Sequence, residues 1–230
     1  MITVCVSVVI PVLNESGLIE SAIEHAWSAG AAEVVVVDGG SQDGTAELAK
    51  QSRCVLVHSA AGRARQQNAG AAIARGEWLL FLHVDCRLEP DAITRAVSQL
   101  NRLGKHWGAF RQQIAAPGWG LRLIEWGNRQ RIAWLGVPYG DQAICVQASL
   151  FRECGGFPDV PILEDLLLSR ALRRRQWPAV LKGPLHVDAR RWKQRGVLRQ
   201  TLRNWRILAA WKLGARPERL VGLYPRHDQS

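Results

Sequence analysis

The sequence predicts an α/β fold built on a doubly wound, mostly parallel sheet. Two observations in residues 1–100 support this prediction. Short, β-branched apolar runs alternate with helix-like segments, which is the pattern of consecutive βαβ units. The runs are continuously apolar, as expected of strands that are buried on both faces of a sheet.

Four strands are expected in this first part, each bounded by turn residues or a proline. Pro11 ends the first strand because proline cannot donate a hydrogen bond to a neighbouring strand. Helices are expected between the strands, and Ser16 is a candidate N-cap for the first of them. The expected strands are 4–10, 33–37, 55–57 and 78–82, and the later helices are 46–52 and 62–75.

The pattern loosens after residue 100. Strands are expected at 107–114, 141–146 and 178–181, and helices at 121–134, 161–173 and 196–213. The last helix is predicted to be amphipathic, with an apolar stripe made by Leu198, Leu202, Trp205 and Ala209 and with arginines beside it. We expect one domain over 1–230, with a first half (1–100), a second half (101–190) and a basic, amphipathic C-terminal segment (191–230).

Composition and length indicate an ordinary globular protein. The chain has 230 residues, of which 47% are hydrophobic and 22% charged. No apolar run is long enough to span a membrane, and neither a basic leader nor a small-residue cleavage site is recognisable, so we expect no signal peptide. Five cysteines without CxxC spacing argue against a disulfide framework and a zinc site. A reducing cytoplasm is the simplest setting.

The net charge of +10 is concentrated near the C-terminus. Residues 170–230 contain 16 Lys and Arg but 3 Asp and Glu, whereas residues 1–169 contain 14 and 17. Such a region favours an anionic partner. No recognised nucleic-acid motif is present, so nucleic acid is not the expected partner. Trp192, Trp205 and Trp211 lie among these arginines, which suits a peripheral contact with an anionic membrane.

The chain has ten tryptophans, which is many for its length. Most are expected in the core, because a large aromatic ring is normally buried. Trp119, Trp126 and Trp134 cluster around the helix expected at 121–134.

A polar loop follows each of the four strands expected in residues 1–100. These loops are at 11–15, 38–45, 62–70 and 83–85. The carboxyl ends of strands in an open α/β sheet are where ligands bind. Glycines in the 38–45 loop would let the backbone approach a ligand closely. Arg63, at a helix N-terminus, suits a phosphate through its charge and the helix dipole. The loops contain neither a dinucleotide fingerprint nor a phosphate-binding P-loop.

His83 and Asp85 follow the most apolar of the strands and are separated by one residue. Residues i and i+2 of an extended strand point to the same side, so the two side chains are expected together at the carboxyl end of the strand. Both are able to bind a metal. In the alternative interpretation Asp85 caps a helix beginning near Glu89, because acidic residues are common at helix starts.

Taken in order, the segments VSVVIPVLNE, VVVVDGGSQDGT and GRARQQNAGAAIARGEWLLFLHVD resemble family 2 glycosyltransferases of the GT-A fold. Three further segments resemble the acceptor half of the same family: Tyr139-Gly140-Asp141-Gln142, Gly155-Gly156-Phe157 and Leu163-Glu164-Asp165. The segments at 189–192 and 195–198 resemble a small bacterial branch linked to arsenosugar-type biosynthesis clusters. The resemblance covers nearly the whole chain, and its specificity lies in the order of the motifs.

The resemblance implies an inverting, hexosyltransferase-type transfer from a UDP- or GDP-linked sugar to an acceptor hydroxyl. It implies Mg²⁺ or Mn²⁺ at Asp85, bridging the donor diphosphate. Asp165 would be the general base, and Glu164 would position the acceptor or assist. By the same resemblance, residues 1–100 are the nucleotide-binding half and 101–190 the acceptor half. The implied nucleotide-binding residues are Pro11, Leu13, Asn14, Glu15, Asp38, Gly39, Gly40, Arg63, Asn68 and Asp85.

His83 stands where the metal motif of the family usually has an acidic residue. Imidazole is a poorer ligand for Mg²⁺ than for Mn²⁺, and His83 could instead hydrogen-bond the ribose. This departure leaves open a second hypothesis, a non-catalytic nucleotide- or anion-binding protein on a degenerate GT-A fold. The presence of Asp165 argues against this second hypothesis, because a protein that only binds a nucleotide does not need a general base. Asp141 is either a substrate contact or a turn residue.

Overall fold

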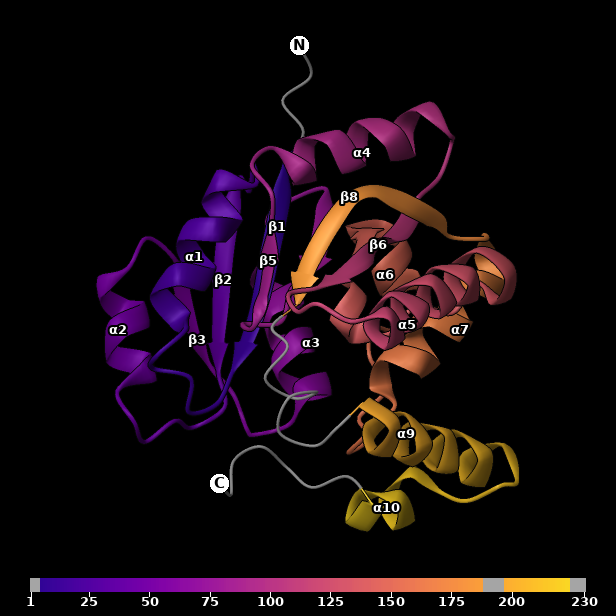
Figure 1. The fold of residues 1–230 in the computed structure, drawn as a ribbon. Helices are drawn as coiled ribbons and strands as arrows, with labels where there is room; N and C mark the ends of the chain where they lie inside the picture. Colours follow the sequence, from indigo (N-terminus) through magenta and orange to yellow (C-terminus); the bar gives the residue numbers. More distant parts are fainter. Residues whose placement is uncertain (1–4, 188–196, 224–230) are drawn as a thin grey trace.

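The computed structural model describes residues 5–187 and 197–223, and its centre is a curled eight-stranded sheet with helices on both faces (Figure 1). The strand order is β3-β2-β1-β4-β7-β6-β8-β5. The pairs β1–β2, β1–β4, β2–β3 and β6–β8 are parallel, whereas β7 and β5 run antiparallel to their neighbours. The strands are β1 Val6–Val12, β2 Glu33–Asp38, β3 Val55–His58, β4 Trp78–Phe81, β5 Cys86–Leu88, β6 Trp107–Ile114, β7 Ile144–Gln147 and β8 Ala179–Val187.

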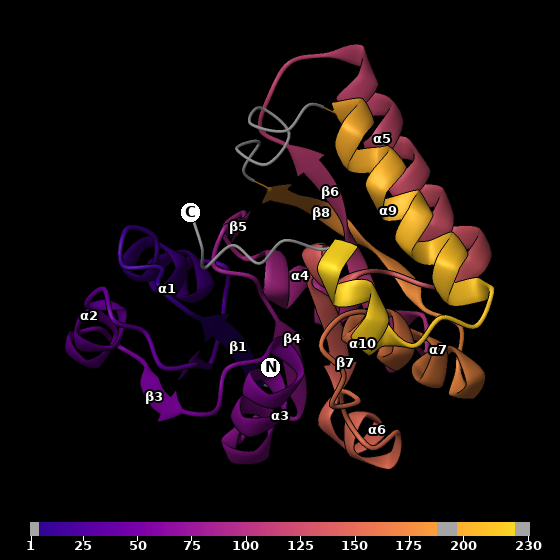
Figure 2. The ribbon, with the colours of Figure 1, turned by 90° about the horizontal axis from the view of Figure 1, so that it is seen from below.

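The helices form one layer on each face of the sheet (Figures 1 and 2). The first layer is α1 Ile19–Ser28, α2 Thr45–Gln51 and α4 Ala92–Arg102, and the second contains α3 Arg63–Ile73, α6 Ala148–Glu153 and α7 Glu164–Arg175. Beyond them lie α5 Trp119–Gln130, the π-helical segment η1 Arg131–Leu135, α9 Val197–Lys212, α10 Pro217–Leu220, and the 3₁₀ turns η2 Gly140–Gln142 and η3 Val221–Leu223.

The central strand β1 is apolar at every position except Ser7, and its packing shows why. Successive side chains of a strand point to opposite faces. Val8 and Ile10 belong to the core beneath α1 and α4, whereas Val9 belongs to the core beneath α3, α6 and α7. The α/β prediction is therefore confirmed, with an antiparallel component contributed by the second half of the chain.

Several local expectations were wrong. Leu18, not Ser16, precedes α1, and the Ser16 amide donates to Asp43 Oδ2 instead (2.9 Å). The strand expected at 141–146 begins only at Ile144, because residues 140–142 form a 3₁₀ turn. The short strand β5 was not expected, and since it follows Asp85 directly, Asp85 does not cap the helix that starts at Ala92.

The C-terminal helix α9 is present, and of the expected apolar stripe only Ala209 has a described side chain. Ile207 is buried and Ala209 is exposed. The side chains of Leu198, Leu202 and Trp205 lie outside the described part of the structure, as do residues 188–196 and 224–230 of the basic segment and its flank. No helix within the described ranges is both long and apolar enough to cross a membrane.

Candidate active site

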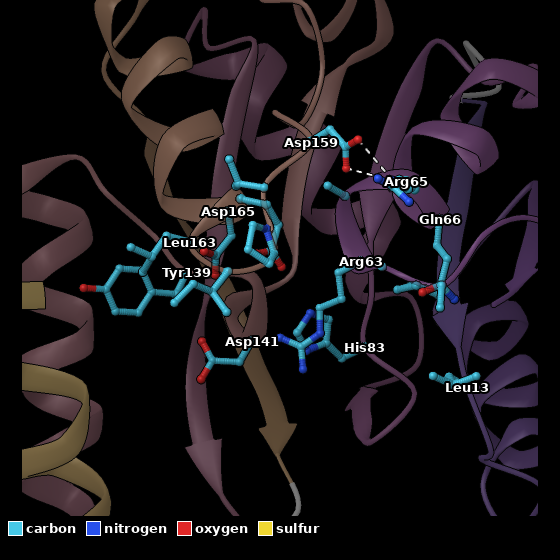
Figure 3. A pocket seen from close by; sticks show the side chains of 18 of the residues that line it. Leu13, Arg63, Arg65, Gln66, His83, Tyr139, Asp141, Asp159, Leu163 and Asp165 are labelled. Atoms are coloured by element: carbon cyan, nitrogen blue, oxygen red, sulfur yellow. Dashed lines mark hydrogen bonds and ion pairs between the residues drawn. The ribbon is translucent and has the colours of Figure 1, made fainter. Parts of the chain in front are cut away.

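A pocket of about 480 Å³ lies where the loops after β1 and β4 face the start of α7 (Figure 3). Its size is that of a small-molecule site. Eight of the residues implied by the resemblance line it: Pro11, Leu13, Glu15, Arg63, His83, Asp85, Glu164 and Asp165. Asp141 and Tyr139 complete the wall beside Asp165, and Ile207 and Leu208 of α9 add an apolar edge.

The loop after β1 is held by the segment after β2 through hydrogen bonds from backbone amides to side-chain oxygens. The Asn14 amide donates to Ser41 Oγ (2.9 Å), and Asn14 Oδ1 accepts from the Gln42 amide (2.9 Å). The Glu15 amide donates to Thr45 Oγ1 (2.8 Å). Asn14 therefore orders this wall of the pocket without lining it. A fixed wall lets the pocket bind a ligand with little loss of chain entropy.

Asp38 and Asn68 do not line the pocket. Asp38 is 2% exposed, and its carboxylate accepts from the amides of Gly40 (3.0 Å) and Ser41 (3.2 Å). Gly39 and Gly40 also do not line the pocket. Asn68 makes two hydrogen bonds to the backbone of Phe157, at 2.7 and 2.9 Å. The nucleotide-binding roles of these residues stay predictions, while their visible contacts support the loops behind the pocket.

His83 and Asp85 lie in a turn between β4 and β5, not at the end of an extended strand. The Cys86 amide donates to the His83 carbonyl oxygen (3.0 Å), which closes the turn. The i, i+2 argument for their proximity was therefore wrong, because β4 ends at Phe81. Both residues nevertheless reach the same pocket.

The donor set at this turn limits how a metal could be held. Within the described residues there is no group of three or more His, Cys, Asp or Glu side chains that could hold a metal ion. Mg²⁺ and Mn²⁺ are often bound by one or two carboxylates, with substrate phosphates and water as the other ligands. Asp85, with or without His83, fits an ion shared with a bound diphosphate and does not fit an ion held by protein alone.

Asp165, the second residue of α7, has both carboxylate oxygens held by backbone amides. Oδ2 accepts from the Gly140 amide (2.5 Å) and Oδ1 from the Leu166 amide (2.7 Å). A Cβ atom built on Gly140 would lie 3.0 Å from His83 Nε2 and 3.3 Å from Asp165 Oδ2. His83 and Asp165 therefore flank Gly140, so the turn after β4 and the start of α7 meet across this glycine.

Glu164, the first residue of α7, also lines the pocket and is 6% exposed. Burial, and then the negative charge of Asp165, raise the pKa of Glu164 to about 7, against the opposing positive charge of Arg63. Glu164 is therefore a buried carboxyl group that keeps its proton to a higher pH than an exposed glutamate does.

A polar network positions the 139–142 turn. Arg131 of η1 stacks on the Tyr139 ring, 3.4 Å from its centroid, and donates to Gln142 Oε1 (2.7 Å). Gln112 of β6 donates to the Asp141 carbonyl oxygen (2.9 Å). Burial raises the pKa of Tyr139, and the carboxylates of Asp165 and Asp141 add to that effect while Arg131 opposes it. These contacts place Tyr139, Asp141 and Asp165 on one side of the pocket (Figure 3).

Sequence reasoning missed the loop before α7, which forms a wall of the pocket from Asp159 to Leu163. Arg65 of α3 pairs with Asp159 at 2.9 Å and joins the loop to the Arg63 side (Figure 3). Gly156, with φ +71°, fits against Asn68, where a Cβ would lie 2.7 Å from Asn68 Oδ1. The apolar run Pro161-Ile162-Leu163 ahead of two acidic residues was the available signal.

Among curated proteins, the chain is similar to two proteins of Haloferax volcanii. It is 33% identical to Glycosyltransferase AglE over 110 residues, covering 43% of this chain and 36% of that protein. It is 32% identical to Glycosyltransferase AglJ over 126 residues, covering 54% of this chain and 42% of that protein. The matches thus cover less than half the length of these relatives.

Among solved structures, the chain shares its fold with S. aureus TarS 1–349 in complex with UDP-GlcNAc. The TM-score is 0.64 at 19% identity, and the match covers 81% of this chain and 59% of that one. It also shares its fold with glucosyl-3-phosphoglycerate synthase from Mycobacterium tuberculosis, solved with Mn²⁺, UDP and glucosyl-3-phosphoglycerate. Here the TM-score is 0.58 at 21% identity, over 80% of this chain and 70% of that one.

The sequence profile that describes glycosyl transferase family 2 matches residues 7–152, more than half of the chain. This match begins in β1 and ends in α6, so it includes the loops after β1 and β4, which line the pocket, and the loop after β2, which supports the first of them. The fold agrees, because its neighbours share the same curled, mostly parallel sheet. The chain belongs to glycosyl transferase family 2.

Proposed function

We propose that the protein is an inverting glycosyltransferase that uses Asp165 as its general base. The observation that carries the proposal is the position of Asp165, which is fixed by two backbone amides on the wall opposite Leu13 and Arg63. A carboxylate held in this way can accept a proton without first reorganising. Family membership supports a nucleotide-sugar donor, and TarS and the mycobacterial synthase were solved with UDP-GlcNAc and UDP.

In the proposed reaction, Asp165 takes the proton of the acceptor hydroxyl. The hydroxyl oxygen then attacks the anomeric carbon of the sugar from the face opposite the leaving group. The bond from that carbon to the diphosphate breaks, the nucleoside diphosphate leaves, and the configuration at the carbon inverts. Arg63 stabilises the negative charge of the leaving diphosphate.

The nucleotide would lie against Pro11, Leu13 and Glu15 in residues 1–100, and the acceptor would enter beside Tyr139 and Asp141. A bound Mg²⁺ or Mn²⁺ at Asp85 would neutralise charge on the diphosphate. His83 is proposed as a second ligand or as a contact to the ribose. The division into a nucleotide half and an acceptor half is part of this proposal.

Further features of the proposal come from the sequence resemblance. The donor is a UDP- or GDP-linked sugar, the transferred group a hexose, and the setting the cytoplasm of a bacterium, with a peripheral contact to an anionic membrane. The arsenosugar-type branch is suggested by residues 189–198, most of which lie outside the described residues. The proposed acceptor is accordingly defined only as a compound with a free hydroxyl.

The test combines binding with release of product. Calorimetric titrations with UDP and GDP, each with Mn²⁺, Mg²⁺ or EDTA, should give metal-dependent binding of one nucleotide that Asp85→Ala abolishes. Incubation with a panel of UDP- and GDP-sugars should release that nucleoside diphosphate. Asp165→Asn should retain the affinity and lose the release.

Two outcomes contradict the proposal. If neither UDP nor GDP binds under any metal condition, the protein does not use a UDP- or GDP-linked sugar as its donor. Binding without release by the wild type, across the panel and with hydroxyl acceptors added, favours the non-catalytic nucleotide-binding protein. The observation behind this second candidate function is that His83 stands where the metal motif of the family usually has an acidic residue.

A further inference from the structure

Helix α5 and the segment η1 carry large apolar side chains on their outer side. Trp119, Leu123 and Trp126 are spaced i, i+4 and i+7, which places them on one face of the helix. Trp134 and Leu135, in the η1 segment that directly continues α5, are exposed as well. The exposed fractions are 84% for Trp119, 58% for Trp126 and 78% for Trp134. We call these five residues the α5–η1 face.

The α5–η1 face is not the face by which α5 packs on the protein. Leu121 is buried, Ile124 packs beside Ile114 of β6, and Ile132 is fully buried. The helix is therefore apolar on two sides, one of them covered by the sheet. The other apolar side, which carries Trp119, Leu123 and Trp126, is exposed.

Exposed apolar side chains are concentrated on this face. Ten large apolar residues are exposed in the described part of the chain, and five of them belong to the α5–η1 face. Figures 1 and 2 both place α5 at the outer edge of the half that contains β6 and β8. An exposed apolar patch of this kind marks an interaction surface.

The polar groups around the face are basic. The one acidic residue in 119–135 is Glu125, which is mostly buried and paired with Arg122 at 2.8 Å. Arg129 is exposed on the same helix. Arg173, near the end of α7, donates to the Leu135 carbonyl oxygen (2.6 Å) and so lies beside η1.

We propose that the α5–η1 face docks on the interface of a membrane that contains anionic lipid. Tryptophan suits the boundary between water and acyl chains, because its ring is apolar and its N–H is polar. Arginines beside the tryptophans strengthen the binding, because they are attracted to the anionic headgroups. A second copy of this chain fits less well, because a two-fold contact would bring the same arginines together.

Docking in this way would bring the acceptor side of the pocket to the membrane. Arg131 of η1 stacks directly on Tyr139, which lines the pocket. An acceptor hydroxyl carried by a lipid would then reach Asp165 from the docked side. This last step rests on the proposed transfer reaction, whereas the docking surface specifies the proposed membrane contact and does not depend on the transfer.

The experiment is co-sedimentation of the full chain with vesicles of phosphatidylcholine alone and of phosphatidylcholine with phosphatidylglycerol. The variant is Trp119→Ser/Trp126→Ser/Trp134→Ser, and the matched control is Val55→Ser/Ile73→Ser/Leu103→Ser, which removes exposed apolar residues elsewhere. Wild type and control should bind the anionic vesicles, more weakly at high salt. The tryptophan variant should bind at least about tenfold more weakly.

Equal binding by the tryptophan variant and the wild type overturns the proposal, as does failure of the wild type to bind anionic vesicles. Light scattering that shows a dimer lost in the tryptophan variant assigns the face to a second copy and also overturns it. If the triple variant fails to fold by circular dichroism, Trp119→Ser alone should bind about threefold more weakly. None of these readouts uses a nucleotide, so they are independent of the proposed transfer.

Discussion

Replacing Glu164 by glutamine should change the way in which the stability of the protein depends on pH. The carboxyl group is buried beside Asp165, and its pKa is raised from 4.5 to about 7. Glutamine has nearly the same shape and imitates the protonated form at every pH. The variant therefore isolates the energetic cost of ionising this one buried group.

The direction of this pH dependence follows from whether the folded or the unfolded protein holds the proton of Glu164. Below pH 4.5 Glu164 is protonated in both the folded and the unfolded protein, so its contribution to stability is fully present. Between 4.5 and about 7 the folded protein binds a proton that the unfolded chain has lost, so the free energy of unfolding falls as pH rises. Above pH 7 both states are ionised and the loss is complete.

The difference between the pKa of Glu164 in the unfolded and in the folded protein corresponds to about 3 kcal/mol in the free energy of unfolding. Urea unfolding followed by tryptophan fluorescence should find Glu164→Gln more stable than the wild type by about 3 kcal/mol near pH 8, and by at most about 1 kcal/mol near pH 5. Glu153→Gln, at an exposed acidic residue, is the control and should match the wild type at both values. A wild type and a Glu164→Gln variant whose stabilities differ by the same amount at both pH values would refute the reasoning.

Further predictions concern close contacts. Gly140→Ala puts a methyl group 3.3 Å from Asp165 Oδ2 and should lower the transfer rate about tenfold with little change in the unfolding midpoint; an unchanged rate would show that the carboxylate can shift freely. Gly70→Ala places a Cβ 2.5 and 2.8 Å from two valine side chains of the sheet. Overpacking of about 1–3 kcal/mol should then outweigh the roughly 1 kcal/mol gain in helix propensity, so chemical denaturation should show a net loss. Asn68→Ala leaves two backbone groups without partners and should lower the free energy of unfolding by about 1–3 kcal/mol; a loss below the error of urea unfolding would mean that water replaces the amide.

The regular first half of the fold could be predicted because its signal is local. Apart from Ser7, the positions of β1 and the interior positions of β2 are apolar, because both faces of these strands are covered, and turn residues stand between the two runs. Strand β5 could not be predicted in this way. It has three residues, and it exists because it pairs with β8 nearly a hundred residues later.

The candidate site was predicted in composition but not in geometry. The order of motifs identified eight residues that do line the pocket. It could not indicate that the carboxylate of Asp38 would be used by its own turn, nor that Asn68 would hold a distant loop. Whether a polar side chain faces a ligand or a neighbouring backbone depends on tertiary packing, which short sequence motifs do not encode.

Helix α3 contributes both to the lining of the pocket and to the support of the loop before Asp165. Its N-terminus presents Arg63 to the pocket, and its next turns hold the loop that leads to Asp165, through Arg65 and Asn68. A small displacement of this helix would therefore move a donor contact and the base together. Kinetic defects caused by substitutions along α3 will combine ground-state binding with chemistry, so a lowered turnover number alone will not identify a residue that touches substrate.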